Sequence, residues 1–311
     1  MVEPADIAFL KRTLRHEVTA LCRWNRQPWK LPFTSTIRAI KDNDWPAVFF
    51  GGTLRSLLVS RIVKKSRGRP RDIDIVLGVP TIDELRSEFH PWITRQTRFG
   101  GLALSRKGWE FDVWPVHETF AFKMAGGEPR FEDLPKTTLL NAEAIAVEVW
   151  PKPGKPRQVY SWDDRFFHGV LTRTLELNQP ANPYPKLSVL RSLVIANQLA
   201  WRVGPRLANF LAMYGTEISE SELIEIQMKH YKAVRLPWDE YSSLLRKILD
   251  ALESGQVGPI ELSRNEQIPL WSQGASSSRK SEIKLIGPSR RRRHSGAFTS
   301  QNLCLLQIQY C

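Results

Sequence analysis

The chain has 311 residues, of which 42% are hydrophobic, so it can form one large domain or two of ordinary size around a buried core. Its 45 Lys and Arg exceed its 32 Asp and Glu, and the formal net charge of +13 favours polyanionic partners such as nucleic acid or phosphorylated substrates. Cys22, Cys304 and Cys311 lack metal-ligand spacing, which argues against a zinc site and a disulfide framework. With no long apolar run and no signal peptide, the expected location is the cytoplasm, without a membrane span.

The first half of the chain has the pattern of a mixed α/β fold. Apolar side chains recur at three- and four-residue steps in its first 40 residues, as in helices, and Thr81 with Glu84 has the spacing of a capping box. Short apolar or alternating runs further along are typical of strands. The expected elements are helices over 7–40, 53–63 and 81–89, and strands over 47–50, 72–77, 102–104, 109–113, 144–150 and 158–161.

In the second half of the chain, the spacing of apolar residues predicts a series of helices. These helices are expected over 163–177, 186–199, 205–213, 219–231 and 237–254. A mixed part followed by an all-helical part predicts an α+β fold with two subdomains. We expect a head over 1–162, a helical neck and body over 163–271, and a basic, Ser- and Arg-rich tail over 272–311 that is disordered.

Two aspartates alternate on the predicted strand over 72–77. Residues i and i+2 of a strand point to the same face, so Asp72 and Asp74 present their carboxylates side by side. Two adjacent anions repel unless a cation lies between them, and Mg²⁺ (or Mn²⁺) prefers such hard oxygen ligands. The alternative interpretation is an exposed strand edge without function.

A glycine pair ends the strand before this one. Gly51 and Gly52 precede a predicted helix whose first backbone N–H groups are free, and together with Thr53 and Arg55 they can hold a triphosphate. The alternative is that Gly-Gly forms only a turn.

The combination of these two motifs resembles the polymerase-β-type nucleotidyltransferase superfamily. A strand, Gly51-Gly52-Thr53-Leu54-Arg55 and a helix are followed by Arg71-Asp72-Ile73-Asp74 on the next strand. The chain is most similar to the class II branch, with CCA-adding enzymes and bacterial poly(A) polymerases, over roughly residues 47–211. The resemblance implies a small mixed-sheet catalytic head, two metal ions, and an NTP held against a helical neck, with Arg71 among the nucleotide-binding residues.

Two later segments resemble the same family. Thr138-Leu139-Leu140-Asn141-Ala142 is similar to its Phe-Thr-Ile-Asn-Ala segment, whose Asn lies near the sugar and metals. Asn141 has the alternative of a capping or turn residue. The helix around Leu190-Arg191 is similar to the family's neck helix, in which Arg191 would contact phosphate; a surface ion pair is the alternative.

Other segments depart from the family pattern. Its Arg-Arg-Asp corresponds to Lys136-Thr137 without an aspartate, its Glu-Asp-x-x-Arg corresponds to residues 184–188 and is absent, and Ser56 replaces an aspartate. Strict selection of CTP and then ATP is therefore not expected, whereas the catalytic carboxylates are present.

Asp112 is the expected third carboxylate. It lies in the second strand of the predicted hairpin, among apolar neighbours that carry it into the sheet, where a charge without a metal or partner is costly. Glu110 points to the same face and is the rival. We therefore expect Asp72, Asp74 and Asp112 to be both catalytic and metal-binding.

Three functions are compatible with these residues. The leading hypothesis is a metal-dependent transfer of NMP from an NTP to an RNA 3′ end, tRNA being one such acceptor, with release of pyrophosphate. The second keeps the chemistry and makes the acceptor a protein or small molecule, as in toxin- or resistance-type members of the superfamily. The third is a non-catalytic nucleic-acid-binding protein, against which clustered carboxylates facing a polyanion argue. The oligomeric state stays open.

Overall fold

The fold was analysed in a computed structural model, which describes residues 3–23, 29–63, 70, 72–78, 81–97, 99–126, 128–181 and 183–262. The chain divides into two compact units, Met1–Leu270 and Trp271–Cys311, and all described residues belong to the first. Arg71 and the predicted tail over 272–311 lie outside the described residues. Within them, no helix has both the length and the apolar character needed to cross a bilayer.

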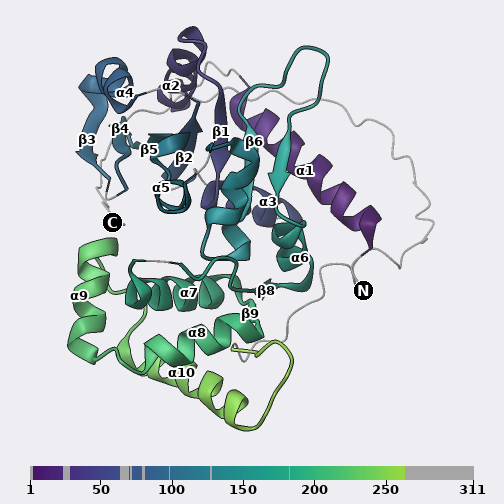
Figure 1. Cartoon of the computed structure of the whole chain (residues 1–311), viewed down its shortest axis with the longest axis vertical. Helices are drawn as coiled ribbons and strands as arrows, with labels where there is room; N and C mark the ends of the chain where they lie inside the picture. Colours follow the sequence, from purple (N-terminus) through teal and green to yellow (C-terminus); the bar gives the residue numbers. More distant parts are fainter. Residues whose placement is uncertain are drawn as a thin grey trace, which may run out of the picture. The chain divides into compact units, whose positions relative to one another are not determined.

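A seven-stranded mixed sheet forms the first half of the chain (Figure 1). Its strands are β1 (Ala47–Phe50), β2 (Asp72–Leu77), β3 (Ile93–Gln96), β4 (Leu102–Arg106), β5 (Trp109–Pro115), β6 (Ile145–Glu148) and β7 (Val159–Ser161). They lie in the order β3-β4-β5-β2-β1-β6-β7. Within this sheet, as far as the structure describes it, β2 and β5 are the strands that pair in parallel, and both lie near its centre.

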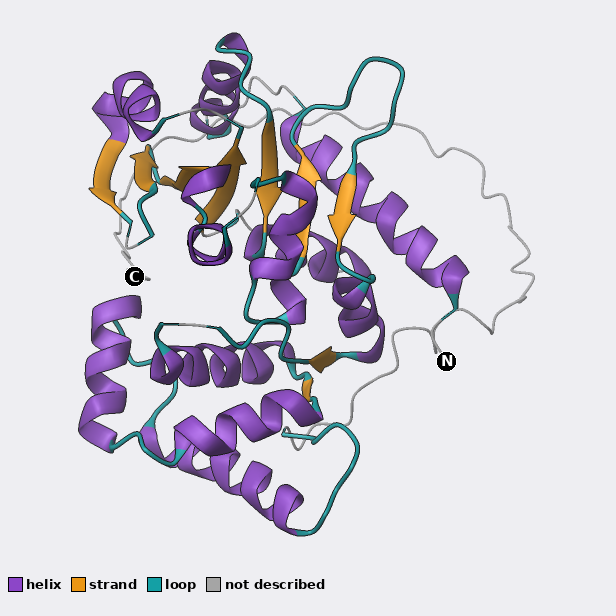
Figure 2. Ribbon diagram, in the orientation of Figure 1, coloured by secondary structure: helices purple, strands orange, loops and turns teal. Residues whose placement is uncertain are grey.

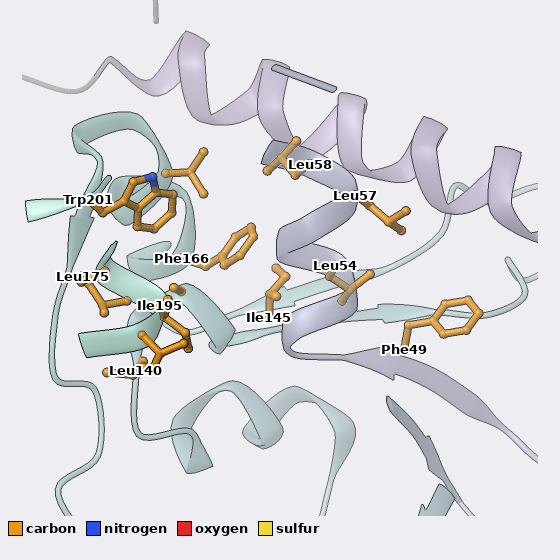
Figure 3. Packing of buried hydrophobic residues seen from close by; sticks show 14 of the residues in the cluster. Phe49, Leu54, Leu57, Leu58, Leu140, Ile145, Phe166, Leu175, Ile195 and Trp201 are labelled. Atoms are coloured by element: carbon orange, nitrogen blue, oxygen red, sulfur yellow. The ribbon is translucent and has the colours of Figure 1, made fainter. Parts of the chain in front are cut away.

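One face of the sheet packs against helices. Those helices are α1 (Pro4–Cys22), α2 (Leu31–Asp42), α3 (Gly52–Ile62) and α4 (Ile82–Phe89). Their apolar stripes share one buried cluster with the inward side chains of the strands. Figure 3 shows Leu54, Leu57 and Leu58 of α3 beside Phe49 and Ile145 of the sheet. Burial of this face fixes the register, because a slip by one residue would expose every second side chain.

The opposite face carries a smaller apolar cluster. Val48, Val76, Ala146 and Leu134 are fully buried there, and Phe50 and Trp114 pack against them. Leu134 comes from the 3₁₀ segment η3 (Phe131–Thr137), and the helix α5 (Phe120–Ala125) follows β5 and a short 3₁₀ turn, η2 (Val116–Glu118). Asp72 and Asp74 alternate with the core residues Ile73 and Ile75, so they lie on this second face.

The rest of the described chain is mainly helical (Figure 2). It contains α6 (Arg165–Thr172), β8 (Thr174–Leu175), α7 (Pro185–Leu199), β9 (Arg202–Val203), α8 (Pro205–Gly215), α9 (Glu220–Tyr231) and α10 (Trp238–Glu253). The α+β fold class is thus confirmed. The predicted border at residue 162 falls between β7 and α6, and the division into two subdomains at this border stays a prediction.

Most predicted elements occur within a few residues of their expected bounds. The expected N-cap forms at Thr81, whose side chain accepts from the Glu84 N–H, and Ser219 accepts from the Glu222 N–H at the start of α9 in the same way. The helix expected over 163–177 ends earlier, at Thr172, because Arg173 adopts a left-handed conformation. The short β3, α5 and the two-residue pair β8–β9 were not predicted, since three exposed side chains in β3 and very short elements give no periodic signal.

Trp29 and Lys30, which directly precede α2, make contacts within the protein. The Trp109 indole N–H donates to the carbonyl of Trp29 at 2.7 Å, and the two rings stack with centroids 6.1 Å apart. The Lys30 ammonium is buried and donates to the carbonyls of Ala20 and Arg23. These contacts assign Trp29 and Lys30 a structural role.

Asn141 joins the sheet to the helical half. It begins the 3₁₀ turn η4 (Asn141–Glu143), and its side-chain amide donates to the carbonyl of Thr174 at 3.0 Å. Its side-chain oxygen accepts from the Glu176 N–H at 2.9 Å. Gly169 of α6 lies against this amide, since a Cβ at Gly169 would come within 2.4 Å of Asn141 Nδ2.

We expect Gly169→Ala to destabilise the protein by roughly 1–3 kcal/mol, because the methyl group must displace a buried hydrogen-bonded amide. This loss outweighs the gain of about 1 kcal/mol that Ala brings to a helix over Gly. Thermal and urea unfolding measure the difference. Gly258→Ala is the control, because a Cβ there meets open space, and its effect should stay within about 0.5 kcal/mol. A Gly169→Ala protein as stable as the wild type would contradict the packing.

Candidate active site

The turn between β1 and α3 forms one wall of the site. Gly51 has φ 65° and ψ −128°, a conformation that side chains disfavour, which is why glycine stands here. The helix α3 starts at Gly52 without a side-chain cap. Its first turn therefore presents backbone N–H groups, which together with the helix dipole favour an anion.

Carboxylates from two neighbouring strands form the second wall. In the parallel pair of β2 and β5, Asp74 lies opposite Asp112, and Asp72 lies opposite Glu110. All four therefore share the second face of the sheet. The three aspartates are partly buried, whereas Glu110 is exposed and its carboxylate accepts a hydrogen bond from the Ser105 hydroxyl at 2.7 Å. The structure thus brings Asp112 next to Asp74 and places Glu110 further out along the same strand.

The surroundings of Asp74 shift the pKa of its carboxyl group strongly. Burial, followed by the charge of Asp112, raises its pKa from 3.8 to about 7, while the Arg191 guanidinium opposes the rise. Asp74 also faces the glycine turn, since its Oδ2 would lie 3.7 Å from a Cβ at Gly51. An isolated buried carboxylate resists ionisation, and a cation at this position would relieve the cost.

Glu143 is a site residue that the sequence did not indicate. It is buried in η4, and its Oε1 accepts hydrogen bonds from Arg55 of α3 at 3.1 Å and from Arg191 of α7 at 2.7 Å. Burial works against its ionisation, but the Arg191 and Arg55 charges outweigh that cost and lower its pKa. The same cluster borders the glycine turn, since a Cβ at Gly52 would lie 3.7 Å from Arg55 Nη2 and 3.8 Å from Glu143 Oε1.

The two arginines of this cluster differ in exposure. The Arg55 side chain is largely buried, whereas about half of the Arg191 side chain (53%) is open to solvent. Glu143 raises the pKa of Arg191, so its charge persists at any physiological pH. Arg191 therefore makes an ion pair, the alternative considered from the sequence, and still leaves part of its side chain exposed. Its contact with phosphate stays a prediction.

Two other predicted nucleotide-binding residues use their side chains within the protein. The Thr53 hydroxyl donates to the backbone carbonyl of Asp72 at 2.6 Å and so ties α3 to the start of β2. The Asn141 amide holds the backbone at Thr174 and Glu176. Thr53 retains its backbone N–H in the uncapped first turn of α3 for a ligand. A nucleotide contact of the Asn141 side chain stays a prediction.

The donor set fits a hard divalent cation. Asp72, Asp74 and Asp112 provide carboxylate oxygens on one face of two paired strands, and the raised pKa of Asp74 reflects its burial beside the charge of Asp112, a cost that a cation would relieve. Over the described ranges, no three His, Cys, Asp or Glu side chains already converge tightly enough to hold an ion. The aspartates would therefore have to draw closer together around a metal.

A pH-dependent stability follows from Asp74. An acid whose pKa rises on folding from 3.8 to about 7 contributes most to stability below 3.8 and loses that contribution as the pH rises through 7. Without divalent cations, the free energy of unfolding should therefore fall between about pH 4 and 7. Asp74→Asn should remove this fall and be more stable than the wild type by roughly 1–3 kcal/mol at about pH 8. Urea titrations across this range test it, and parallel curves for the two proteins would contradict it.

Comparisons with known proteins give similar solved structures only. The sequence matches no family profile and no curated protein. Similar structures include a tRNA nucleotidyltransferase complexed with a primer tRNA and an incoming ATP analogue (17% identity, TM-score 0.48, 70% of this chain and 61% of that one). CCA-adding enzyme complexes with ATP (15%, 0.48, 68% and 50%) and CTP (15%, 0.49, 77% and 53%) are also similar. The chain thus spans less than two thirds of their length, and similarity at this level does not identify its reaction.

Proposed function

We propose that this protein is a metal-dependent nucleotidyltransferase. The observation that carries the proposal is the juxtaposition of Asp74 and Asp112 with an uncapped helix N-terminus at Gly51–Gly52. Clustered carboxylates attract divalent cations, and a helix N-terminus attracts phosphate. A nucleoside triphosphate complexed with a divalent cation carries both groups, a cation for the carboxylates and a polyphosphate for the helix N-terminus.

The triphosphate would bind at the first turn of α3. The N–H groups of Gly52 and Thr53 and the guanidinium of Arg55 lie on this turn, and Arg191 approaches it from α7 through Glu143. Charge-assisted hydrogen bonds from guanidinium groups hold phosphate oxygens in fixed directions, which aligns the α-phosphate for in-line attack. Arg71 immediately precedes Asp72 in the sequence and would add a further positive charge.

Asp72, Asp74 and Asp112 would hold Mg²⁺ or Mn²⁺. When bound, such ions activate the attacking hydroxyl and stabilise the charge on the leaving pyrophosphate. The protein itself contributes the carboxylates on a central pair of strands, whose register places them on one face of the sheet. We place this chemistry in a head over 1–162, with residues 163–271 supplying the neck helix that carries Arg191 and the rest of the body.

The acceptor is proposed to be an RNA 3′ end. The net charge of +13 favours a polyanion, and a structure similar in fold is a tRNA nucleotidyltransferase complexed with a primer tRNA. A protein or small-molecule acceptor is the competing proposal within the same chemistry. The two differ in where a labelled nucleotide ends up.

Incubation with each α-labelled NTP, Mg²⁺ or Mn²⁺, total RNA and total protein separates these proposals. We expect label in RNA, at its 3′ ends. Label in protein alone would contradict the RNA acceptor and would support the competing proposal, in which the acceptor is a protein. A nucleic-acid-binding protein without activity would label neither and would still bind RNA in a salt-dependent manner.

Asp72→Asn, Asp74→Asn and Asp112→Asn should each lower the transfer rate at least about 100-fold, since each removes a carboxylate from the metal-binding set. Folding should be retained, because loss of one negative charge relieves repulsion within the site. Glu110→Gln is the matched control on the neighbouring position of the same face and should keep its rate. If Glu110→Gln abolishes transfer and Asp112→Asn keeps it, the third carboxylate of the site is Glu110 and not Asp112.

A further inference from the structure

Three aromatic rings from separate segments meet at the surface of the protein. Phe99 lies in the turn between β3 and β4, Phe120 begins α5, and Tyr184 precedes α7. The Phe99 ring centroid is 5.5 Å from that of Phe120 and 6.3 Å from that of Tyr184. Phe99 and Tyr184 are 46% and 41% exposed. Clustered exposed aromatic rings of this kind mark a binding surface more often than isolated ones do.

The turn that carries Phe99 is held firmly. The Thr97 N–H donates to the carbonyl of Gly101 at 2.7 Å, and the Gly100 N–H donates to the carbonyl of Thr97 at 3.1 Å. Gly101 packs so closely on β5 that a Cβ would lie 2.9 Å from the Cβ of Trp114. Phe99 is thus positioned by backbone contacts, and a ring positioned in advance loses little entropy when a ligand stacks on it.

The aromatic cluster connects to the candidate active site from two sides. Along β5, Trp114 lies two residues beyond Asp112 on the same face, and its indole N–H donates at 3.1 Å to Thr119, directly before Phe120. Along α7, Tyr184 lies seven residues, about 10 Å, before Arg191. The strand that carries Asp112 and the helix that carries Arg191 thus each lead to the aromatic cluster.

Polar side chains of the described residues beside the cluster have partners within the protein. The Lys186 ammonium contacts both carboxylate oxygens of Glu222 at 2.9 Å, and the Ser188 hydroxyl donates to the carbonyl of Tyr184. On the other side, Lys123 pairs with Glu118. The ring faces themselves can bind any base by stacking.

We propose that Phe99, Phe120 and Tyr184 form a stacking platform for the base of the incoming nucleoside triphosphate, with little selection among the four bases. This proposal rests on the proposed function. It assigns the substrate class as any ribonucleoside triphosphate, and it places the base on rings supplied jointly by the sheet-bearing half and by α7.

Calorimetry with the full chain, Mg²⁺ and each of ATP, GTP, CTP, UTP and inorganic tripolyphosphate tests the platform. We expect Tyr184→Ala and Phe99→Ala to weaken all four NTPs by about 5- to 100-fold and to leave tripolyphosphate unchanged, because only the base loses its contact. Tyr184→Phe should bind like the wild type, since it keeps the ring. Phe9→Ala is the matched control, because Phe9 is an equally exposed aromatic residue (45%) on α1. Melting temperatures establish that each variant is folded.

The outcomes separate the platform from the proposed function. If the wild type binds neither NTP nor tripolyphosphate, both proposals are wrong. If it binds both and the alanine variants bind NTP equally well, only the platform is wrong. A loss confined to one base would contradict the lack of selection, and a loss of affinity for a short RNA with normal NTP binding would place the acceptor's base on the rings instead.

Discussion

The carboxylate of Glu143 and its two arginines are the contact on which the geometry of the site depends. A single oxygen accepts from Arg55 of α3 and from Arg191 of α7, so one buried charge fixes the first turn of the phosphate-facing helix relative to the neck helix. Removing either arginine would leave the buried charge of Glu143 with a single cationic partner. Removing Glu143 would leave two guanidinium groups close together beside the glycine turn. Two residues earlier, Asn141 fixes the same 3₁₀ turn to the backbone around β8.

The site has opposite charges in two separate places. Asp72, Asp74 and Asp112 concentrate negative charge on the open face of β2 and β5, while Arg55, Arg191 and the N-terminus of α3 concentrate positive charge beside them. Glu143 forms ion pairs with both arginines, and burial together with the charge of Asp112 raises the pKa of Asp74 although the Arg191 charge opposes the rise. Such a division suits a ligand that brings a cation and a polyphosphate together.

Local sequence patterns predicted the strands, the glycine turn and the aspartate pair because each depends on neighbours within a few residues. Asp112 was found from its strand, but its position opposite Asp74 depends on the parallel pairing of β2 with β5, which no local pattern specifies. Glu143 was missed because its partners lie 88 and 48 residues away. Its sequence signal is a charged residue inside the run Leu139 to Val147, which is otherwise apolar except for Asn141, and burial of that charge without a partner would be costly.

Crystallography of the protein with Mn²⁺ and a non-hydrolysable NTP analogue tests the central claim most directly, because the anomalous signal of manganese locates the metal independently of the nucleotide. The proposed mechanism requires manganese between Asp72, Asp74 and Asp112, and the triphosphate at the first turn of α3 beside Arg55 and Arg191. Manganese bound away from these aspartates, or a triphosphate bound away from the Gly51–Gly52 turn, would contradict it.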